Sequence, residues 1–186
     1  MKRIFDLLLA VILSIALTPL MLMISIMVVL TSKGPVVHWS DRFGKNNIIF
    51  KMLKFRTMVI DTPNVATNLL NNPQSYLTPI GGFLRSTSLD ELPQLFSIIV
   101  GDMSFLGPRP ALYNQFDLIA LRTSKGLHQF RPGITGLAQV SGRDGLTLVD
   151  KVAFEIAHMN KQSVWFDLKI LKMTIVNVVK RAGVSH

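Results

Sequence analysis

The sequence of 186 residues contains no cysteine. The chain therefore forms no disulfide framework, no thiolate metal site and no cysteine nucleophile. Acidic residues are also scarce, since 11 Asp and Glu stand against 20 Lys and Arg and leave a net charge of +9. Tryptophan and tyrosine number only 2 each, which provides few aromatic platforms for stacking single-stranded nucleic acid. The positive charge thus indicates either a nucleic-acid binder or a protein on an anionic membrane that handles phosphorylated substrates. Because the aromatic platforms are few, we expect no nucleic acid partner.

Charged residues are few as well, at 17% of the chain, whereas hydrophobic residues make up 49%. Soluble domains typically carry about 25% charged residues. The composition excludes a disordered tail or a collagen-like chain and argues against an ordinary cytosolic enzyme. The length suits one domain with an appendage, not two independent globular domains.

One long apolar segment lies near the N-terminus, at residues 7–30, with no charge after Asp6. About 20 such residues span a bilayer, whereas the apolar region of a signal peptide has only about 7–15 and ends in a small-residue cleavage site. We therefore expect a retained membrane segment. Basic residues flank it on both sides, at Lys2, Arg3 and Lys33.

The middle of this segment contains Thr18-Pro19. Proline removes a helical hydrogen bond and clashes with the preceding turn, so we expect a break or kink there. Two arrangements satisfy the residues alone: a hairpin that enters and leaves one leaflet, or a kinked anchor that spans. Positive charge at both ends favours keeping both flanks in the cytoplasm.

Residues 34–186 show no repeat or linker and are expected to form one compact cytoplasmic domain of mostly helical α+β class. Surface loops are expected at 61–79 and 130–145. The periodicity predicts short strands at 36–39 and 48–55, around a turn at 44–47, and helices at 89–100, 112–121, 148–160 and 164–180. The last helix has one apolar face, which suits either packing on the core or an amphipathic helix in the membrane interface.

Two carboxylates, Asp90 and Glu91, stand at the predicted start of a helix. Ser88-Leu89-Asp90-Glu91 fits a capping box, which is the purely structural interpretation. Carboxylates at a helix N-terminus also suit phosphate chemistry, either as ligands of a divalent cation or through an aspartate nucleophile. The four histidines are scattered, so a zinc site is not expected.

An arginine between two prolines, Pro108-Arg109-Pro110, follows downstream. Proline fixes the backbone, so the guanidinium is held on a rigid segment and suits bidentate recognition of phosphate. Pairing with a carboxylate is the structural alternative. The glycine-rich stretch 131–143 permits close approach of the backbone to a ligand, or simply makes turns.

Taken in order, five runs of sequence resemble the bacterial sugar transferase family, the small monotopic polyprenyl-phosphate phosphoglycosyl transferases. They are Lys54-Phe55-Arg56-Thr57-Met58, Ser88-Leu89-Asp90-Glu91-Leu92-Pro93-Gln94-Leu95, Gly101-Asp102-Met103-Ser104, Gly107-Pro108-Arg109-Pro110 and the run from Arg131 to Val140. The resemblance extends over nearly the whole chain. It implies transfer of a sugar 1-phosphate from a UDP-sugar to undecaprenyl phosphate, a polyprenyl phosphate. The products would be a polyprenyl diphosphosugar and UMP, in the first membrane step of bacterial glycoconjugate assembly.

The resemblance also implies roles for particular residues. Asp90 would be the nucleophile that carries a covalent phosphosugar and would hold Mg2+, with Glu91 as its catalytic partner. Basic residues expected to bind substrate are Lys54, Arg56, Arg85, Arg109 and Arg143. Residues 1–33 would form a re-entrant membrane helix hairpin in the inner leaflet of the bacterial cytoplasmic membrane, with residues 34–186 as the catalytic domain facing the cytoplasm.

The alternative from another class is a non-catalytic, basic, membrane-anchored protein that binds nucleic acid or anionic lipid. A second alternative is an inactive relative that serves as an assembly subunit. Neither accounts for the Asp90-Glu91 pair. The choice of sugar, and whether the chain forms a homodimer, are left open by the sequence.

Overall fold

The structure is a computed structural model that describes residues 2–63, 70–142, 145–161 and 163–179. It contains two compact units, of which the first is built from Met1–Ser40 and Met52–Ile99 and the second from Asp41–Lys51 and Val100–Ser185. These units are defined by packing. The boundary after residue 33, which separates an expected membrane segment from an expected aqueous domain, stays a prediction.

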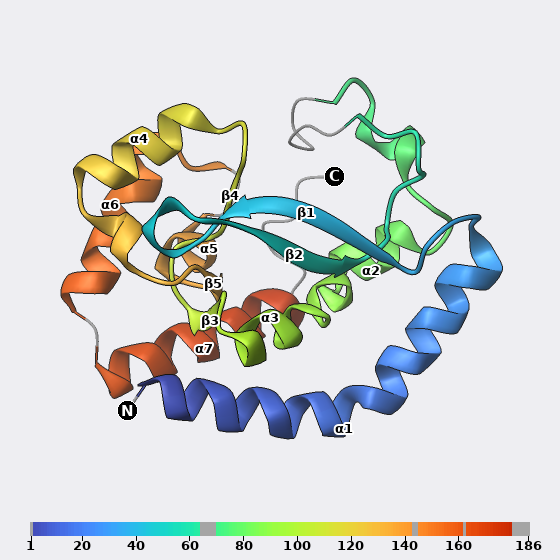
Figure 1. The fold of residues 1–186 in the computed structure, drawn as a ribbon, viewed down its shortest axis with the longest axis horizontal. Coiled ribbons are helices and arrows are strands. Elements are labelled where there is room, and N and C mark those ends of the chain that lie inside the picture. The colour runs from blue at the N-terminus through green and yellow to red at the C-terminus, as the bar shows by residue number, and fades with distance from the viewer. Residues whose placement is uncertain (1, 64–69, 143–144, 162, 180–186) are drawn as a thin grey trace. The chain divides into compact units, whose positions relative to one another are not determined.

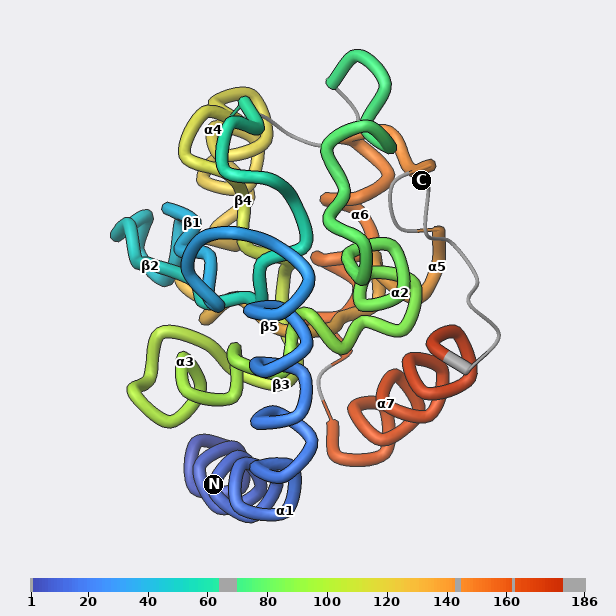
Figure 2. The backbone as a smooth tube through the Cα atoms, turned by 90° about the vertical axis from the view of Figure 1, so that its right-hand side faces the viewer, coloured from blue at the N-terminus to red at the C-terminus, as the bar shows by residue number. Residues whose placement is uncertain are grey.

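Helix α1 (Lys2–Thr31) opens the first unit and contains Pro19. The sequence predicted two arms with a break at Thr18-Pro19, and here the structure corrects it: the helix is continuous and bends near its middle (Figure 1). In Figure 2 its first turns are seen nearly end-on, whereas its later turns rise across the view. A proline removes only one helical N–H, and the Thr18 hydroxyl bonds to the Ser14 carbonyl oxygen at 2.7 Å, so the result is a bend without a break.

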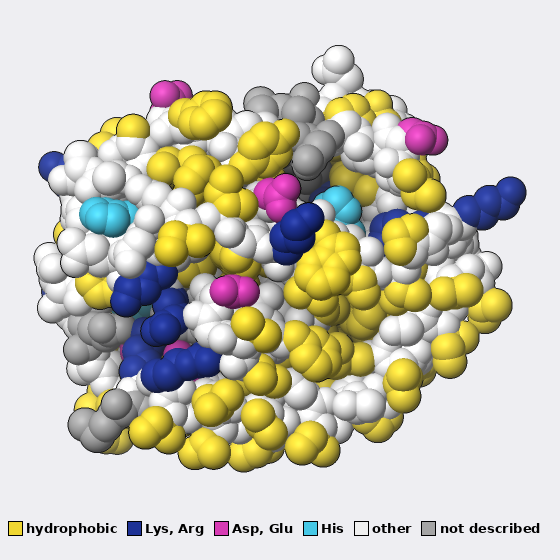
Figure 3. Space-filling view, in the orientation of Figure 1, with side chains coloured by type: hydrophobic (Ala, Val, Ile, Leu, Met, Phe, Trp, Pro, Cys, Tyr) yellow, Lys and Arg dark blue, Asp and Glu magenta, His cyan; other side chains and the backbone are white. Residues whose placement is uncertain are grey.

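One side of α1 packs on its own unit while most of its surface stays exposed. Ile24 and Val28 are buried in a cluster with Phe55 and Leu84. Apolar side chains elsewhere on the helix remain exposed, such as Ile15 at 71% and Leu30 at 78%. Figure 3 shows hydrophobic side chains gathered along the edge where α1 runs. The helix is long and apolar enough to cross a membrane, by length and composition.

The rest of the first unit is a chain of short helices: η3 (Pro73–Tyr76), α2 (Gly81–Ser86), η4 (Leu89–Glu91) and α3 (Gln94–Val100). The helix predicted at 89–100 is thus present in two pieces, because Pro93 lies between η4 and α3. It ends where expected, since Gly101 takes a left-handed φ of 110° that a glycine adopts without strain.

Both ends of α1 are bound within this unit by arginines. Arg3 donates to the carbonyl oxygens of Ile98 at 2.5 Å and Ile99 at 3.0 Å, near the end of α3. Arg56 donates to the Ser32 carbonyl oxygen at 2.8 Å and to Lys33. Carbonyls at a helix C-terminus lack intrahelical donors, so each guanidinium supplies them.

The strand predicted at 48–55 is confirmed as β2 (Ile49–Phe55), whereas the strand predicted at 36–39 is longer than expected, as β1 (Val37–Phe43). The two strands form a hairpin through the single turn η1 (Lys45–Asn47). The hairpin runs from the first unit into the second. There β4 (Ala111–Leu112) extends the sheet to the order β2-β1-β4, with Arg42 opposite Leu112.

The second unit also holds a short parallel pair, β3 (Ser104–Leu106) with β5 (Gly133–Thr135), which sequence periodicity did not reveal. Its helices are α4 (Phe116–Ser124), η5 (Leu127–Gln129), α5 (Leu137–Ser141), α6 (Leu148–Asn160) and α7 (Val164–Val179). The predictions for α6 and α7 are confirmed, although residue 180 lies outside the described residues.

One predicted helix is misplaced. The sequence predicted a helix at 112–121, whereas α4 begins at Phe116 because Leu112 pairs with Arg42 in the sheet. A buried cluster of Ala111, Leu118, Leu127 and Val152 then joins α4, η5 and α6. The fold class, mostly helical α+β with small sheets, is confirmed.

Candidate functional site

The Asp90-Glu91 pair lies on a single tight turn whose apolar side faces the core. Leu89 and Leu92 are three residues apart and pack against the cluster of Ile24, Val28, Phe55 and Leu84. Residues three apart lie on the same side of a 3₁₀ turn, so Asp90 and Glu91 lie on its other sides. Asp90 is nonetheless buried, with 6% of its surface exposed.

Lys54 faces both carboxylates from β2. Its Nζ lies 2.7 Å from Glu91 Oε1 and 3.7 Å from Asp90 Oδ2. The three side chains are shielded from solvent, with exposed fractions of 17%, 13% and 9% for Lys54, Glu91 and Asp90. The ammonium group offsets the repulsion between two adjacent carboxylates, and it supplies a positive charge where a phosphate would bind.

The capping-box interpretation of this segment is wrong. Ser88 takes a left-handed φ of 56°, and its side chain makes no capping hydrogen bond to the turn. Left-handed backbone is uncommon for residues other than glycine and often accompanies functional sites. Without a serine cap, the capping box does not explain why Asp90 and Glu91 stand at this position, and their chemical role stays the hypothesis.

The carboxylate pair fits the magnesium prediction in one specific way. Mg2+ is usually held by one or two carboxylates together with substrate phosphates, not by a cage of protein ligands. Within the described ranges no three His, Asp or Glu side chains gather as a metal-binding group. Asp90 and Glu91 could therefore hold Mg2+ that is shared with a diphosphate, and Mg2+ at this place stays a prediction.

The other predicted substrate-binding residues of the first unit lie differently. Arg56 is buried, at 5% exposed, and donates to Ser32 and Lys33 at the end of α1. This arrangement gives it a structural task in addition to any role toward substrate. Arg85 is half-buried on α2, the helix just before η4. Arg143 lies outside the described residues.

In the second unit, Arg109 stands on a segment held against β5. Gly107 N donates to the Thr135 carbonyl oxygen at 3.0 Å, and Gly133 N to that of Pro108 at 2.9 Å. A Cβ at Gly133 would lie 2.1 Å from Gly107 N. Only glycine permits this approach, which explains why Gly-Pro-Arg-Pro and Arg-Pro-Gly can lie side by side.

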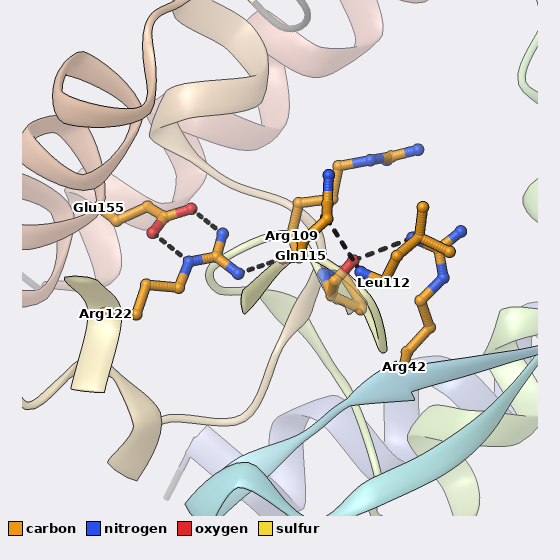
Figure 4. A network of polar contacts seen from close by, with 7 residues as sticks. Arg42, Arg109, Leu112, Gln115, Arg122 and Glu155 are labelled. Carbon is orange, nitrogen blue, oxygen red and sulfur yellow. Dashed lines mark hydrogen bonds and ion pairs between the residues drawn. The ribbon is translucent and has the colours of Figure 1, made fainter. Parts of the chain in front are cut away.

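Two further arginines contact the backbone of the Pro108-Arg109-Pro110 segment. Arg122 Nη1 donates to the Arg109 carbonyl oxygen at 2.9 Å, and Arg42 Nη1 to that of Pro110 at 3.2 Å. Arg122 is in turn paired with Glu155, through Nε to Oε2 at 2.8 Å and Nη2 to Oε1. Figure 4 shows the Arg109 side chain extending away from the Arg122–Glu155 pair.

A pocket of the second unit opens beside this segment. Its lining residues are Phe43, Gly44, Asn47, Pro108, Arg109, Ala111, Ile119, Arg122, Leu127, His128, Phe130 and Pro132. The walls combine two arginines with aromatic, proline, imidazole and amide groups.

Sequence reasoning missed Arg122 and Glu155. They lie 33 residues apart, on α4 and α6, and no local motif includes both. A buried arginine and a buried glutamate on two amphipathic helices would have been the only signal, and burial was not readable from the pattern.

Comparison with known proteins gives a consistent result. The family model described as bacterial sugar transferase matches residues 1–181. The exopolysaccharide production protein ExoY of Sinorhizobium fredii is 37% identical over 197 residues, which cover 98% of this chain and 87% of that protein.

Two further relatives are larger proteins. The UDP-glucose:undecaprenyl-phosphate glucose-1-phosphate transferase of Escherichia coli is 36% identical over 94% of this chain and 39% of its own length. The galactosyl transferase CpsE of Streptococcus agalactiae is 36% identical over 81% of this chain and 36% of its own length. The chain therefore spans less than half of these two relatives.

Proposed function

The chain belongs to the bacterial sugar transferase family, and on that premise we propose that it transfers a sugar 1-phosphate from a UDP-sugar to polyprenyl phosphate. The observation that carries this proposal is the buried Asp90 beside Glu91, with Lys54 Nζ 3.7 Å from Asp90 Oδ2 and 2.7 Å from Glu91 Oε1. A shielded carboxylate beside a fixed cation is suited to attack a phosphorus atom whose charge must be neutralised.

The reaction would proceed in two displacements. The Asp90 carboxylate oxygen attacks the sugar-bearing phosphorus of the donor, an oxygen–phosphorus bond forms, and the bond to the bridging oxygen of UMP breaks. An oxygen of polyprenyl phosphate then attacks the same phosphorus and releases the Asp90 carboxylate. The product is polyprenyl diphosphosugar, and the enzyme returns to its starting state.

Residues around the nucleophile would have distinct tasks. Lys54 neutralises charge on the transferred phosphoryl group and holds Glu91 in place. Glu91, with Asp90, would bind Mg2+, which when bound neutralises and orients the donor diphosphate. Arg109 would bind the donor phosphates.

We also propose that α1 enters and leaves one leaflet, so that both of its ends lie on the cytoplasmic side. Arg3 near its start contacts α3, and Arg56 contacts its end, and all of these belong to one compact unit. A helix whose ends lay on opposite sides of a bilayer could not place both ends against the same aqueous unit. The bend at Pro19 supports this topology.

Release of UMP from UDP-sugars tests the reaction. The purified protein in detergent or nanodiscs is incubated with Mg2+, undecaprenyl phosphate and each of several UDP-sugars. UDP-glucose and UDP-galactose come first because two relatives carry these sugars in their names. With the donor alone, UMP release should stop after a single turnover, when Asp90 carries the phosphosugar, whereas repeated release of UMP should also require undecaprenyl phosphate. A non-catalytic binding protein would release none with any sugar.

A further inference from the structure

The second unit contains one buried ion pair that the proposed reaction does not use directly. Arg122 on α4 and Glu155 on α6 meet through two hydrogen bonds, and their side chains are only 10% and 3% exposed. Taking two charges out of water is costly, so a buried pair is seldom more stabilising than apolar side chains of similar volume. The pair therefore calls for an explanation other than stability.

Apolar contacts already join the two helices. Leu118 and Leu127 are buried with Val152 of α6 in one cluster. What an apolar pair could not provide is the third hydrogen bond of Arg122, from Nη1 to the Arg109 carbonyl oxygen at 2.9 Å. The Glu155 carboxylate accepts hydrogen bonds from Nε and Nη2 of the Arg122 guanidinium. These two bonds fix the plane of the guanidinium, and with it the direction in which Nη1 points.

The segment that receives this bond needs outside support. Pro108 and Pro110 have no N–H groups and cannot donate to neighbouring backbone. Carbonyl oxygens are thus the main points at which the segment can be held, and Arg122 and Arg42 bind two successive ones. Arg109 and Arg122 also line the same pocket, and the Arg109 side chain is exposed while its backbone is held by the buried Arg122.

We propose that Arg122, oriented by Glu155, is a positioning residue that fixes the backbone of Arg109 for binding the donor diphosphate. This inference rests on the proposed function, in which Arg109 binds the donor phosphates. A guanidinium binds phosphate through two parallel hydrogen bonds, whose strength depends on its direction. Freedom of the Arg109 backbone would weaken both bonds at once.

The test replaces the pair by apolar residues, Arg122→Met with Glu155→Leu, because removing one partner alone would leave a buried charge unpaired and could prevent folding. The double variant should melt within a few degrees of the wild type. Its KM for the UDP-sugar should rise about tenfold, with a smaller change in kcat. Arg122→Lys keeps a positive charge beside Glu155 but removes the planar guanidinium that bonds to both Glu155 and the Arg109 carbonyl oxygen. This variant should also raise KM.

A matched control removes a different polar pair of the same unit. His158 Nε2 and Asp167 Oδ1 lie 3.2 Å apart, with the histidine side chain 2% exposed. His158→Leu with Asp167→Leu should change the melting temperature more than KM. An equal rise of KM in this control would overturn the proposal, because loss of any polar pair in this unit would then have the same effect.

Coupling to Arg109 gives the decisive measurement. If Arg122 acts through Arg109, Arg109→Lys should cost much less in the Arg122→Met/Glu155→Leu background than in the wild type. Calorimetric binding of UDP, which carries the diphosphate and no sugar to transfer, should show the same pattern without turnover. A folded double variant with wild-type KM, wild-type UDP affinity and the full Arg109→Lys penalty would overturn the inference.

The two proposals fail in distinguishable ways. UDP binding that depends on Arg122 in a protein that releases no UMP would leave the positioning role intact and overturn the reaction. UMP release that is indifferent to Arg122 would do the reverse. Absence of UDP binding to the wild-type protein would overturn both.

Discussion

Lys54 Nζ and Glu91 Oε1 lie 2.7 Å apart, although the two residues are separated by 37 positions in the chain. The contact joins strand β2 to the turn η4, and it brings the ammonium group within 3.7 Å of Asp90 Oδ2. Lys54 thus connects the first of the five sequence runs to the second, and the candidate nucleophile acquires a fixed positive neighbour.

The nucleophile itself can be tested by Asp90→Asn. An amide cannot attack phosphorus, so turnover should fall by roughly 10³-fold or more, and the phosphosugar adduct seen by intact mass after incubation with UDP-sugar alone should vanish. Asp61→Asn, at an exposed carboxylate of the same unit, should leave both unchanged. An adduct that persists in a folded Asp90→Asn protein would show that another residue attacks.

Lys54→Met should weaken the site without removing the nucleophile. A hydrogen bond to a charged group contributes about 1.5–3 kcal/mol, so kcat/KM should fall roughly 10- to 100-fold. Lys51→Met removes an exposed lysine from the same strand and should have little effect in the same UMP-release assay. Equal losses in the two variants would mean that general basic charge, not the contact with Glu91, is responsible.

Arg109→Lys keeps the positive charge and removes the guanidinium that can donate two parallel hydrogen bonds to phosphate. We expect kcat/KM for the UDP-sugar to fall about tenfold, which corresponds to roughly 1.4 kcal/mol of lost transition-state binding. Arg131→Lys provides the comparison, because Arg131 is exposed and donates through Nε to the Gly101 carbonyl oxygen. Wild-type steady-state kinetics for Arg109→Lys would argue against bidentate phosphate binding.

Gly133→Ala tests the close approach of β5 to Gly107, which follows β3. The added Cβ would meet Gly107 N at 2.1 Å and Thr135 O at 2.6 Å, both backbone atoms that cannot rotate away. Overpacking of this kind typically costs about 1–3 kcal/mol, so the melting temperature should fall by roughly 3–10 °C. Gly145→Ala, where nothing lies within 4 Å of the new Cβ, should melt as the wild type does.

The topology of α1 can be measured by labelling, because the chain has no cysteine of its own. Lys2→Cys should be protected from an impermeant thiol reagent in intact spheroplasts and become reactive after lysis. Pro19→Ala should straighten the helix, whose 30 residues would then extend about 45 Å, enough to span.

In that straightened variant we expect position 2 to become accessible from outside and the contact of Arg3 with α3 to be lost. External labelling in the protein that keeps Pro19 would instead establish a spanning anchor. Ser32→Cys serves as the second reporter, since the two positions should respond alike in the hairpin topology.

The sequence by itself determined the features that depend on neighbours along the chain. The bounds of α6 follow from its apolar period and from Thr147, whose hydroxyl accepts from Asp150 N. The apolar segment at 7–30 and the order of the five sequence runs needed no structure. Each of these is a property of a short window, in which backbone preference and hydrophobic period agree.

Tertiary structure decided the rest, because the deciding partners are distant. Leu112 lies in a strand where the local pattern favoured a helix, since Arg42 pairs with it. The Ser88 side chain does not form the capping bond that the local sequence allows, and Leu89 and Leu92 of the same turn pack on the core. Arg122 meets Glu155 only because α4 and α6 pack together. Such contacts form when loops close and side chains are buried, and a local sequence pattern encodes neither event.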